Sequence, residues 1–142
     1  MSPPQLSLLL LPGRFAVCKL DPGACIPGWA IGSLFVSITR TSDELSIVCD
    51  EDTVPEGVKC ARNWRCLRVA GAMDFSVIGV LASLVAPLAR AQISVFAIST
   101  FDTDYLLFQA KDLVGAQDTL LRMGHVFNTV PHASSPSLLT NA

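Results

Sequence analysis

Two aspartates, Asp102 and Asp104, stand two positions apart in the segment FAISTFDTDYLLF, residues 96–108. Side chains two apart on an extended chain point to the same side, so the pair would place two negative charges on one wall of a site. Such a wall would accept hydrogen bonds from a cationic group such as an ammonium. Aspartate also stabilises hairpin turns through hydrogen bonds of its own side chain, and turn chemistry is the competing interpretation of both residues.

The sequence offers few other groups for catalysis or metal binding. No third acid or histidine lies near Asp102 and Asp104, so we expect no metal site there. The chain has no Gly-x-Ser-x-Gly elbow, no His-Glu-x-x-His motif and no phosphate-cradling glycine loop, and we assign no catalytic residue and no cofactor. His125 follows a helix stop, where a cation suits the helix dipole. Proton transfer by Asp102, Asp104 or His125 in a closed pocket stays open as an alternative.

Composition narrows the class of protein. The chain has 142 residues, enough for one ordinary domain or two very small ones that share a core. Its net charge is −2 with 10 Lys and Arg, which leaves no basic patch for nucleic acid. The longest nearly uncharged span, 75–89, is shorter than the roughly 20 apolar residues of a membrane-spanning helix. The N-terminus lacks the cationic start of a signal peptide, so we expect a cytoplasmic protein without a membrane span.

The cysteines indicate no built-in cross-links. There are five of them, an odd number, and no two form a Cys-x-x-Cys pair, so neither a disulfide framework nor a zinc knuckle is indicated. We expect reduced thiols, buried as small apolar side chains. The five are Cys18, Cys25, Cys49, Cys60 and Cys66.

Regular elements surround the two aspartates in the second half of the chain. A half-exposed strand is expected at 64–70, and a helix over 75–91 where leucines and valines recur at helical spacing, with a kink at Pro87. Asp112 and Gly124 are expected to cap the start and the end of a second, amphipathic helix. The remaining expected elements are a strand at 93–99 buried on both faces, a hairpin turn at 100–103, a strand at 104–109 and a strand at 126–130.

The first half is less regular. A short strand is expected at 6–11, and the prolines and glycines of 15–29 allow at most one or two helical turns. Apolar, β-branched runs at 32–40 and 41–51 flank a turn cluster and predict a hairpin. Residues 51–63 are predicted to be a loop.

The order of elements predicts the fold class. Strand, helix, strand, strand, helix, strand in the second half is the order of a ferredoxin-like unit. The first half has strands in similar places and no convincing second helix. The predicted class is α+β: two ferredoxin-like βαββαβ units, the N-terminal one degenerate, with antiparallel sheets and helices on one face. We place the N-terminal unit at 1–62, the C-terminal unit at 63–130 and a flexible tail at 131–142.

One run, residues 64–108, resembles a known family. It reads WRCLRVAGAMDFSVIGVLASLVAPLARAQISVFAISTFDTDYLLF and is similar to the ACT domains of the small tandem-ACT proteins related to the CASTOR arginine sensors. The likeness continues through KDLVGAQDTLLRMGH and extends weakly to LPGRFAVCKL and LFVSITRTSDELSIVC at the front. It implies two ferredoxin-like ACT units that bind an amino acid or a similar small metabolite at their interface.

The resemblance also implies which residues contact the ligand. An aspartate near the strand after the long helix would hold the cationic side of the ligand, and the beginning of the helix its backbone end. The segment DPGACIPGWAIG looks like an insertion and departs from the family's pattern. It lies in the first half of the chain, which should supply one half of the pocket. The matching positions are Asp74, Phe75, Ser76, Gly79 and Val80 at the helix start, and Ser99, Thr100, Phe101, Asp102 and Asp104 at the loop.

Elementary chemistry is compatible with such a site. A free amino acid needs one donor-rich wall and one acceptor-rich wall. The unpaired N–H groups and positive dipole end of a helix N-terminus stabilise a carboxylate by about 0.3 to 1 kcal/mol beyond their hydrogen bonds, and residues 75–79 would supply them. Asp102 and Asp104 would supply the acceptors. Asp74 has a competing role as a helix N-cap, where aspartate is favoured by about 1 kcal/mol over alanine.

Three functions follow, and the sequence does not name the ligand. We expect first a non-catalytic binding or sensing module of the ACT type for an amino acid, a homodimer that either stands alone or reports its occupancy to a protein partner. The alternative is a small enzyme or accessory factor that uses the same cleft on an amino-acid-derived substrate; a pocket acid with a raised pKa and turnover would indicate it. The third is a structural interaction protein whose cleft is filled by side chains such as Phe75 and Phe101.

Overall fold

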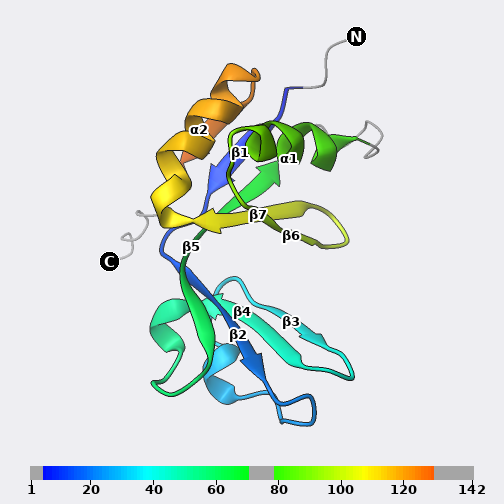
Figure 1. Ribbon diagram of the computed structural model, residues 1–142, viewed down its shortest axis with the longest axis vertical. Helices are drawn as coiled ribbons and strands as arrows, with labels where there is room; N and C mark the ends of the chain where they lie inside the picture. Colours follow the sequence, from blue (N-terminus) through cyan, green and yellow to red (C-terminus); the bar gives the residue numbers. More distant parts are fainter. Residues whose placement is uncertain (1–4, 71–78, 130–142) are drawn as a thin grey trace, which may run out of the picture. The chain divides into compact units, whose positions relative to one another are not determined.

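The computed structural model describes residues 5–70 and 79–129. They form two compact units (Figure 1). The N-terminal unit consists of residues 13–65, and the C-terminal unit combines the described residues before 13 with those from 66 onward. Strand β5 (Cys60–Ala70) contributes its first part to the N-terminal unit and its second part to the C-terminal unit.

The C-terminal unit has the predicted ferredoxin-like order. After β5 come α1 (Val80–Arg90), β6 (Phe96–Ser99), β7 (Asp104–Gln109), the 3-10 helix η3 (Ala110–Asp112), α2 (Leu113–Arg122) and β8 (Val126–Thr129). The sheet has the order β8-β1-β5-β7-β6. This confirms the predicted strand, helix, strand, strand, helix, strand sequence of the second half.

The first strand of the chain, β1 (Ser7–Leu10), completes this sheet. It pairs antiparallel with β5 and parallel with β8, with Leu8 opposite Val69 on one side and Phe127 on the other. Leu6 and Leu8 are buried in the same core as the helices. The strand expected at 6–11 therefore lies in the C-terminal unit.

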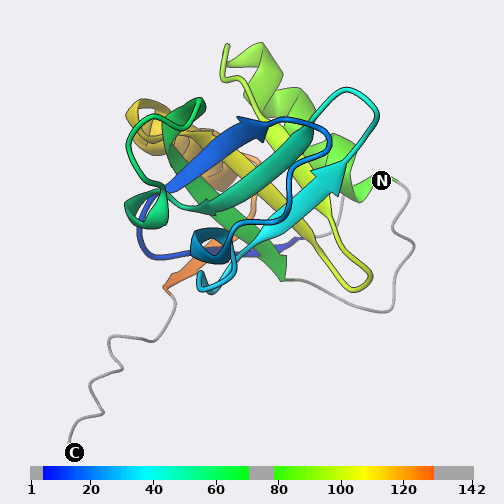
Figure 2. The same cartoon turned by 90° about the horizontal axis from the view of Figure 1, so that it is seen from below.

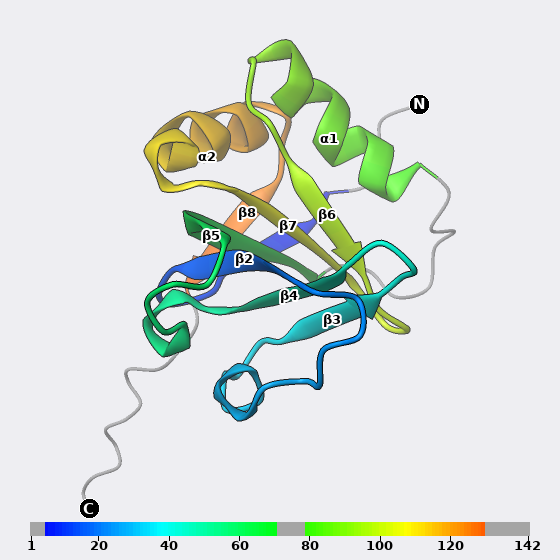
Figure 3. The same cartoon turned by 60° about the horizontal axis from the view of Figure 1, so that its bottom comes forward.

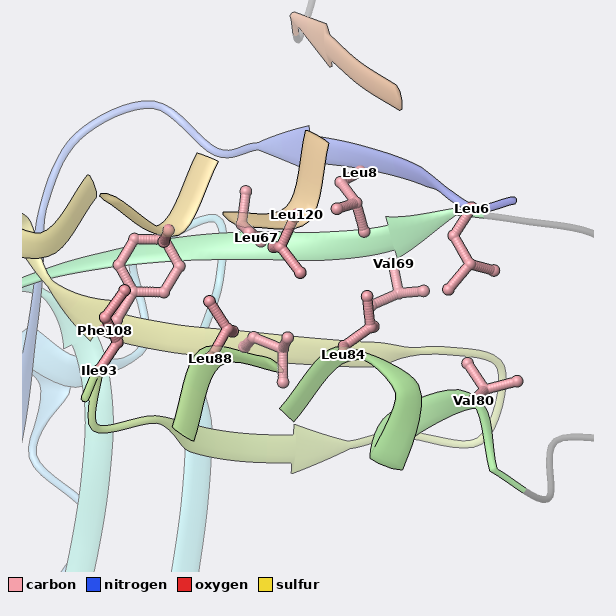
Figure 4. Close-up of a cluster of buried hydrophobic side chains, with 12 residues drawn as sticks. Leu6, Leu8, Leu67, Val69, Val80, Leu84, Leu88, Ile93, Phe108 and Leu120 are labelled. Atoms are coloured by element: carbon pink, nitrogen blue, oxygen red, sulfur yellow. The ribbon is translucent and has the colours of Figure 1, made fainter. Parts of the chain in front are cut away.

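Both helices cover one face of this sheet (Figure 3). Buried Val80, Leu84 and Leu88 recur every four residues on α1, which gives that helix one apolar stripe. Figure 4 shows Leu88 of this stripe facing Leu67 of β5 and Leu120 of α2. Burying a side chain of this size stabilises the fold by about 1.5 to 3 kcal/mol. None of the helices in the described residues is long and apolar enough to cross a membrane.

The two helices end in the same way. In α2 the predicted stop Gly124 has φ +97°, and the Gly124 N–H and His125 N–H donate to Leu121 O at 2.9 Å and Leu120 O at 3.2 Å. This pair of bonds is a Schellman motif. In α1 the Gln92 N–H and Ile93 N–H bond Ala89 O and Leu88 O in the same pattern, both at 2.9 Å, with Gln92 at φ +66°.

The helix expected over 75–91 is present as α1 from Val80, preceded by Gly79 at φ +87°, and residues 75–78 lie outside the described residues. Two other expectations for this half are wrong. The strand expected at 93–99 is not buried on both faces: β6 starts at Phe96, pairs only with β7 among the described strands, and alternates half-buried and exposed residues as an edge strand does. Asp112 stands at the N-cap of α2 but makes no side-chain cap bond, because η3 leads directly into the helix.

The N-terminal unit repeats the topology with 3-10 helices in place of α-helices. Its sheet order β3-β4-β2-β5 is that of a ferredoxin-like unit, and Figure 2 shows the paired strands in blue to green. Pro22, Pro27 and Pro55 interrupt the connections where helices would lie. Its elements are β2 (Phe15–Leu20), η1 (Gly28–Ala30), β3 (Ser37–Arg40), β4 (Leu45–Asp50), η2 (Glu51–Thr53) and the first part of β5. The degenerate first unit and its hairpin are confirmed. Two details were wrong: 15–29, expected to give only helical turns, begins with strand β2, and 51–63 is not all loop, because β5 begins at Cys60.

The central hairpins of the two units match residue for residue in length. Each has a four-residue strand, a four-residue turn and a six-residue strand, followed at once by a 3-10 helix. In both turns a threonine comes first and an aspartate third: TSDE at 41–44 and TFDT at 100–103. The two units are therefore similar to each other in the length and turn sequence of their central hairpins.

Candidate ligand site at the turn between β6 and β7

The turn that joins β6 and β7 is held by hydrogen bonds between its first and last residues. The Thr100 N–H donates to Thr103 O at 2.8 Å, and the Thr100 hydroxyl donates to the same carbonyl at 3.0 Å. The Thr103 N–H donates in return to Thr100 Oγ1 at 3.2 Å. These bonds leave the two central residues, Phe101 and Asp102, at the tip.

The turn is also fastened to the sheet. The Thr103 hydroxyl donates a hydrogen bond to Val69 O near the end of β5. Ser99 and Asp104 lie opposite each other at the end of the β6-β7 ladder, and the Ser99 hydroxyl donates to the Asp104 carboxylate at 2.6 Å. Asp104 is therefore already engaged within the hairpin, as the turn interpretation expects, with further acceptor capacity on its second oxygen.

Phe101 and Asp102 are available to a partner. The Phe101 side chain is 102% exposed relative to a reference residue, so it contributes no packing to the described fold. Asp102 is exposed, and no hydrogen bond or ion pair joins its carboxylate to the described residues. Of the two aspartates, Asp102 is the one whose carboxylate has no role in the hairpin.

The expected helix-start residues are placed only in part. Asp74, Phe75 and Ser76 lie outside the described residues. Gly79 is exposed with φ +87°, and it precedes α1 as its N-cap without a side-chain cap bond. The Val80 side chain is 7% exposed and belongs to the core. Val80 could therefore contact a ligand through its backbone N–H.

The start of α1 and the β6-β7 turn belong to one end of the C-terminal unit. Thr103 is bonded to the end of β5, and the chain passes from that end to α1. Figure 4 shows Val80 at the same end as the hairpin turn. An N-terminal helix end and an acidic turn at one end of a unit supply the two kinds of polar group that an amino acid requires.

The turn of the N-terminal unit is closed by bonds of the same kind. There the Thr41 N–H donates to Glu44 O at 2.9 Å, and the N–H groups of Asp43 and Glu44 donate to Thr41 Oγ1 at 3.0 and 3.1 Å. Asp43 matches Asp102 in position, and its side chain is likewise exposed. Residue 101 distinguishes the two tips: it is a phenylalanine where the N-terminal turn has Ser42.

His125 is not the helix-terminal cation that the sequence suggested. It is 3% exposed, its Nδ1 accepts a hydrogen bond from the Leu6 N–H at 3.2 Å, and burial lowers its pKa. A ring nitrogen that accepts is unprotonated, so the neutral ring carries its proton on Nε2, which has no hydrogen-bond partner among the described residues. Sequence reasoning missed this role because Leu6 is remote in the chain.

Comparison with known proteins agrees with this architecture. An ACT-domain model matches residues 59–122, and a model described as an N-terminal domain matches 13–57. The crystal structure of protein Atu0741 from Agobacterium tumefaciens is 39% identical, with a TM-score of 0.87 over 92% of this chain and 97% of that one. The chain belongs to the ACT-domain family.

Two further proteins resemble this ACT-domain protein more weakly, one in sequence and one in fold. The cytosolic arginine sensor for mTORC1 subunit 1 of Rattus norvegicus is 30% identical over 89% of this chain. The chain spans 37% of the length of that sensor. The regulatory subunit of aspartate kinase from Thermus flavus shares the fold at 12% identity, with a TM-score of 0.59 over 85% of this chain and 99% of that one.

The candidate turn lies inside the ACT match, which spans α1, β6 and β7. Among the residues that the structure describes in this ACT-domain protein, no three His, Cys, Asp or Glu side chains come together as a metal site.

Proposed function

We propose that this ACT-domain protein is a non-catalytic regulatory module that binds a free amino acid at the end of the C-terminal unit. Asp102 would receive the cationic part of the ligand, either the α-ammonium or the side chain of a basic amino acid. The backbone N–H groups at the start of α1 would receive the carboxylate. Ser99, Thr100, Phe101 and Asp104 would complete the turn side of the site, and Asp74, Phe75, Ser76, Gly79 and Val80 the helix side.

The observation that carries this proposal is the exposed pair Phe101 and Asp102 on a turn that is otherwise fully bonded. The turn is closed by Thr100 and anchored by Thr103, so both ends of its tip are fastened before a ligand arrives. A preorganised acceptor loses less conformational entropy on binding. A fully exposed phenylalanine beside it gives an apolar surface that can cover the aliphatic part of an amino acid.

The names of the relatives favour an amino acid over other metabolites. The rat relative is an arginine sensor, and the Thermus flavus neighbour is the regulatory subunit of an aspartate kinase. We extend from these names that the chain works in the cytoplasm on a regulated protein partner. We propose a homodimer because ACT-type units often pair across a two-fold axis.

A thermal-shift screen of the purified protein against the common amino acids and the polyamines tests the proposal. A ligand at 100 times its Kd stabilises the folded state by about 2.7 kcal/mol, which raises the melting temperature measurably. We expect one amino acid, or one chemical group of them, to raise it and the polyamines to leave it unchanged, because they lack the carboxylate. No shift with any amino acid at saturating concentration would contradict the proposal.

A further inference from the structure

Three of the five cysteines gather in the core of the N-terminal unit, whereas the candidate ligand site belongs to the C-terminal unit. Cys18 of β2 and Cys49 of β4 are buried, and Cys60 at the start of β5 packs against the same cluster of apolar side chains at intermediate exposure. Burial and the neighbouring thiols of Cys49 and Cys60 raise the pKa of Cys18 to about 12. All the described cysteines are free thiols in the structure.

Cys18 and Cys60 are direct cross-strand partners. The register of β2 and β5 places Cys18 opposite Cys60 in an antiparallel ladder. The next residues along, Lys19 and Lys59, are joined by a hydrogen bond from Lys19 N–H to Lys59 O at 3.0 Å. Hydrogen-bonded and non-hydrogen-bonded pairs alternate in such a ladder, so Cys18 and Cys60 form a non-hydrogen-bonded pair.

That register is one in which a disulfide can form without moving the backbone. The Cα atoms of a non-hydrogen-bonded pair are about 4.5 Å apart, and their side chains project to the same face. Disulfides are found with Cα separations of about 4.4 to 6.8 Å. Cys49 lies on β4 opposite Ala16, two residues from Cys18, and is therefore only a diagonal neighbour of Cys18.

We propose that Cys18 and Cys60 are an oxidation site that closes to a reversible disulfide. The oxidant is a low-molecular-weight disulfide such as oxidised glutathione. The more accessible Cys60 thiolate attacks one sulfur of the oxidant, forms a mixed disulfide, and releases the first small thiol. Cys18 then loses its proton, attacks the sulfur of its cross-strand partner Cys60 and displaces the second small thiol. The raised pKa of Cys18 makes this the slow step, and no outside reagent has to reach the buried Cys18. The two cysteines lose two protons and two electrons, and one oxidant molecule becomes two thiols.

The bond would link two strands that are far apart in the sequence. A cross-link of this kind restricts the unfolded chain, so the oxidised protein melts at a higher temperature than the reduced protein. The effect is confined to the N-terminal unit and does not require the proposed amino-acid ligand. Cys25, which is exposed and outside this cluster, provides an internal control for reagent activity.

The test is incubation of the folded full chain with oxidised glutathione, followed by acid quenching and peptide mapping by mass spectrometry. We expect a peptide pair linked between Cys18 and Cys60, lighter by two hydrogens than the free peptides, and its loss on treatment with dithiothreitol. Cys25 is expected to carry only a glutathione adduct. Circular dichroism before quenching establishes that the protein is folded during the reaction.

Single variants separate the steps. Cys18→Ser should trap the mixed disulfide on Cys60, Cys60→Ser should leave Cys18 a free thiol, and Cys25→Ser should leave the cross-link intact. A parent protein in which Cys60 keeps its glutathione adduct beside a free Cys18 would overturn the proposal. A cross-link from Cys18 to Cys49 instead, or an unreacted Cys60 while Cys25 is modified, would overturn it equally.

Discussion

Asp102 and Asp43 occupy the same place in two matching turns, the third of four residues between the edge strand of each unit and its neighbour. Both turns are closed by a threonine whose N–H donates to the last carbonyl of the turn and whose Oγ1 accepts from a turn N–H. Any effect of Asp102 beyond turn formation can therefore be measured against Asp43 in the same molecule. The two aspartates form a built-in comparison between turn chemistry and ligand binding.

Phe101 is expected to matter for binding and not for folding. Phe101→Ser gives the C-terminal turn the residue that Ser42 supplies in the N-terminal turn. Because the Phe101 side chain is fully exposed, the free energy of unfolding should change by less than about 0.5 kcal/mol. The Kd for the stabilising amino acid should rise several-fold, as measured by calorimetric titration. A large loss of stability with unchanged affinity would show that Phe101 packs against the protein.

Two glycines of the second helix should respond to alanine in opposite directions. Gly124 has φ +97°, so Gly124→Ala should lower the free energy of unfolding by about 1 kcal/mol. Gly115 lies inside α2, and a Cβ there would meet Ile93 Cδ1 at an ordinary 3.6 Å. Gly115→Ala should therefore raise the free energy of unfolding by about 0.5 to 1 kcal/mol. Urea unfolding measures both, and two changes of the same sign would refute the assignment of the helix end.

His125 should make the protein lose stability in mild acid. Burial lowers the pKa of folded His125, while the unfolded chain keeps its ordinary value near 6.5. The contribution of neutral His125 to the free energy of unfolding is complete above the unfolded pKa and is lost as the pH falls through the folded pKa. Protonation of the ring also removes the acceptor of the Leu6 N–H.

Urea unfolding at about pH 7.5 and about pH 5.5 measures this loss. His125→Leu cannot titrate. Its apolar side chain is of the kind that Ile93 provides at the equivalent position after the first helix. Its loss of stability between the two pH values should be smaller than that of the parent. An equal loss in both proteins would assign the acid sensitivity to other groups.

Cys66 should be inert in the folded protein. Burial raises the pKa of its thiol to about 12, so the thiolate fraction near neutral pH is very small and reagent access is blocked. Iodoacetamide at about pH 8 should label Cys25 in the folded protein and Cys66 only after unfolding in denaturant. Mass spectrometry of the labelled peptides gives both rates, and comparable rates under folding conditions would contradict the described core.

Much of the C-terminal unit could be predicted because its signals are local. The apolar stripe of α1, the Gly124 stop and the turn cluster at 100–103 each act within a few residues of the chain. The place of β1 could not be predicted, because a four-residue apolar strand carries no information about which strands it will pair with. The edge position of β6 was missed for the same reason: an apolar run does not reveal whether a strand has one neighbour or two.

The candidate site was predictable in its composition and not in its contacts. The aspartates at 102 and 104 were visible in the sequence, whereas the bond from Ser99 that engages one of them, and the anchor from Thr103 to Val69, depend on strand register. Cys18 and Cys60 show the same limit. Their spacing in the sequence suggests nothing, and only the pairing of β2 with β5 brings them face to face.

The measurement that tests the central claim most directly is calorimetric titration of the stabilising amino acid into the parent, Asp102→Asn and Asp43→Asn proteins. Asparagine keeps the size and turn preference of aspartate and removes the charge. We predict that Asp102→Asn weakens binding about tenfold or more, equivalent to about 1.4 kcal/mol. Asp43→Asn should bind like the parent. Equal affinity in all three proteins would contradict the account and leave Asp102 a turn residue, as Asp43 is.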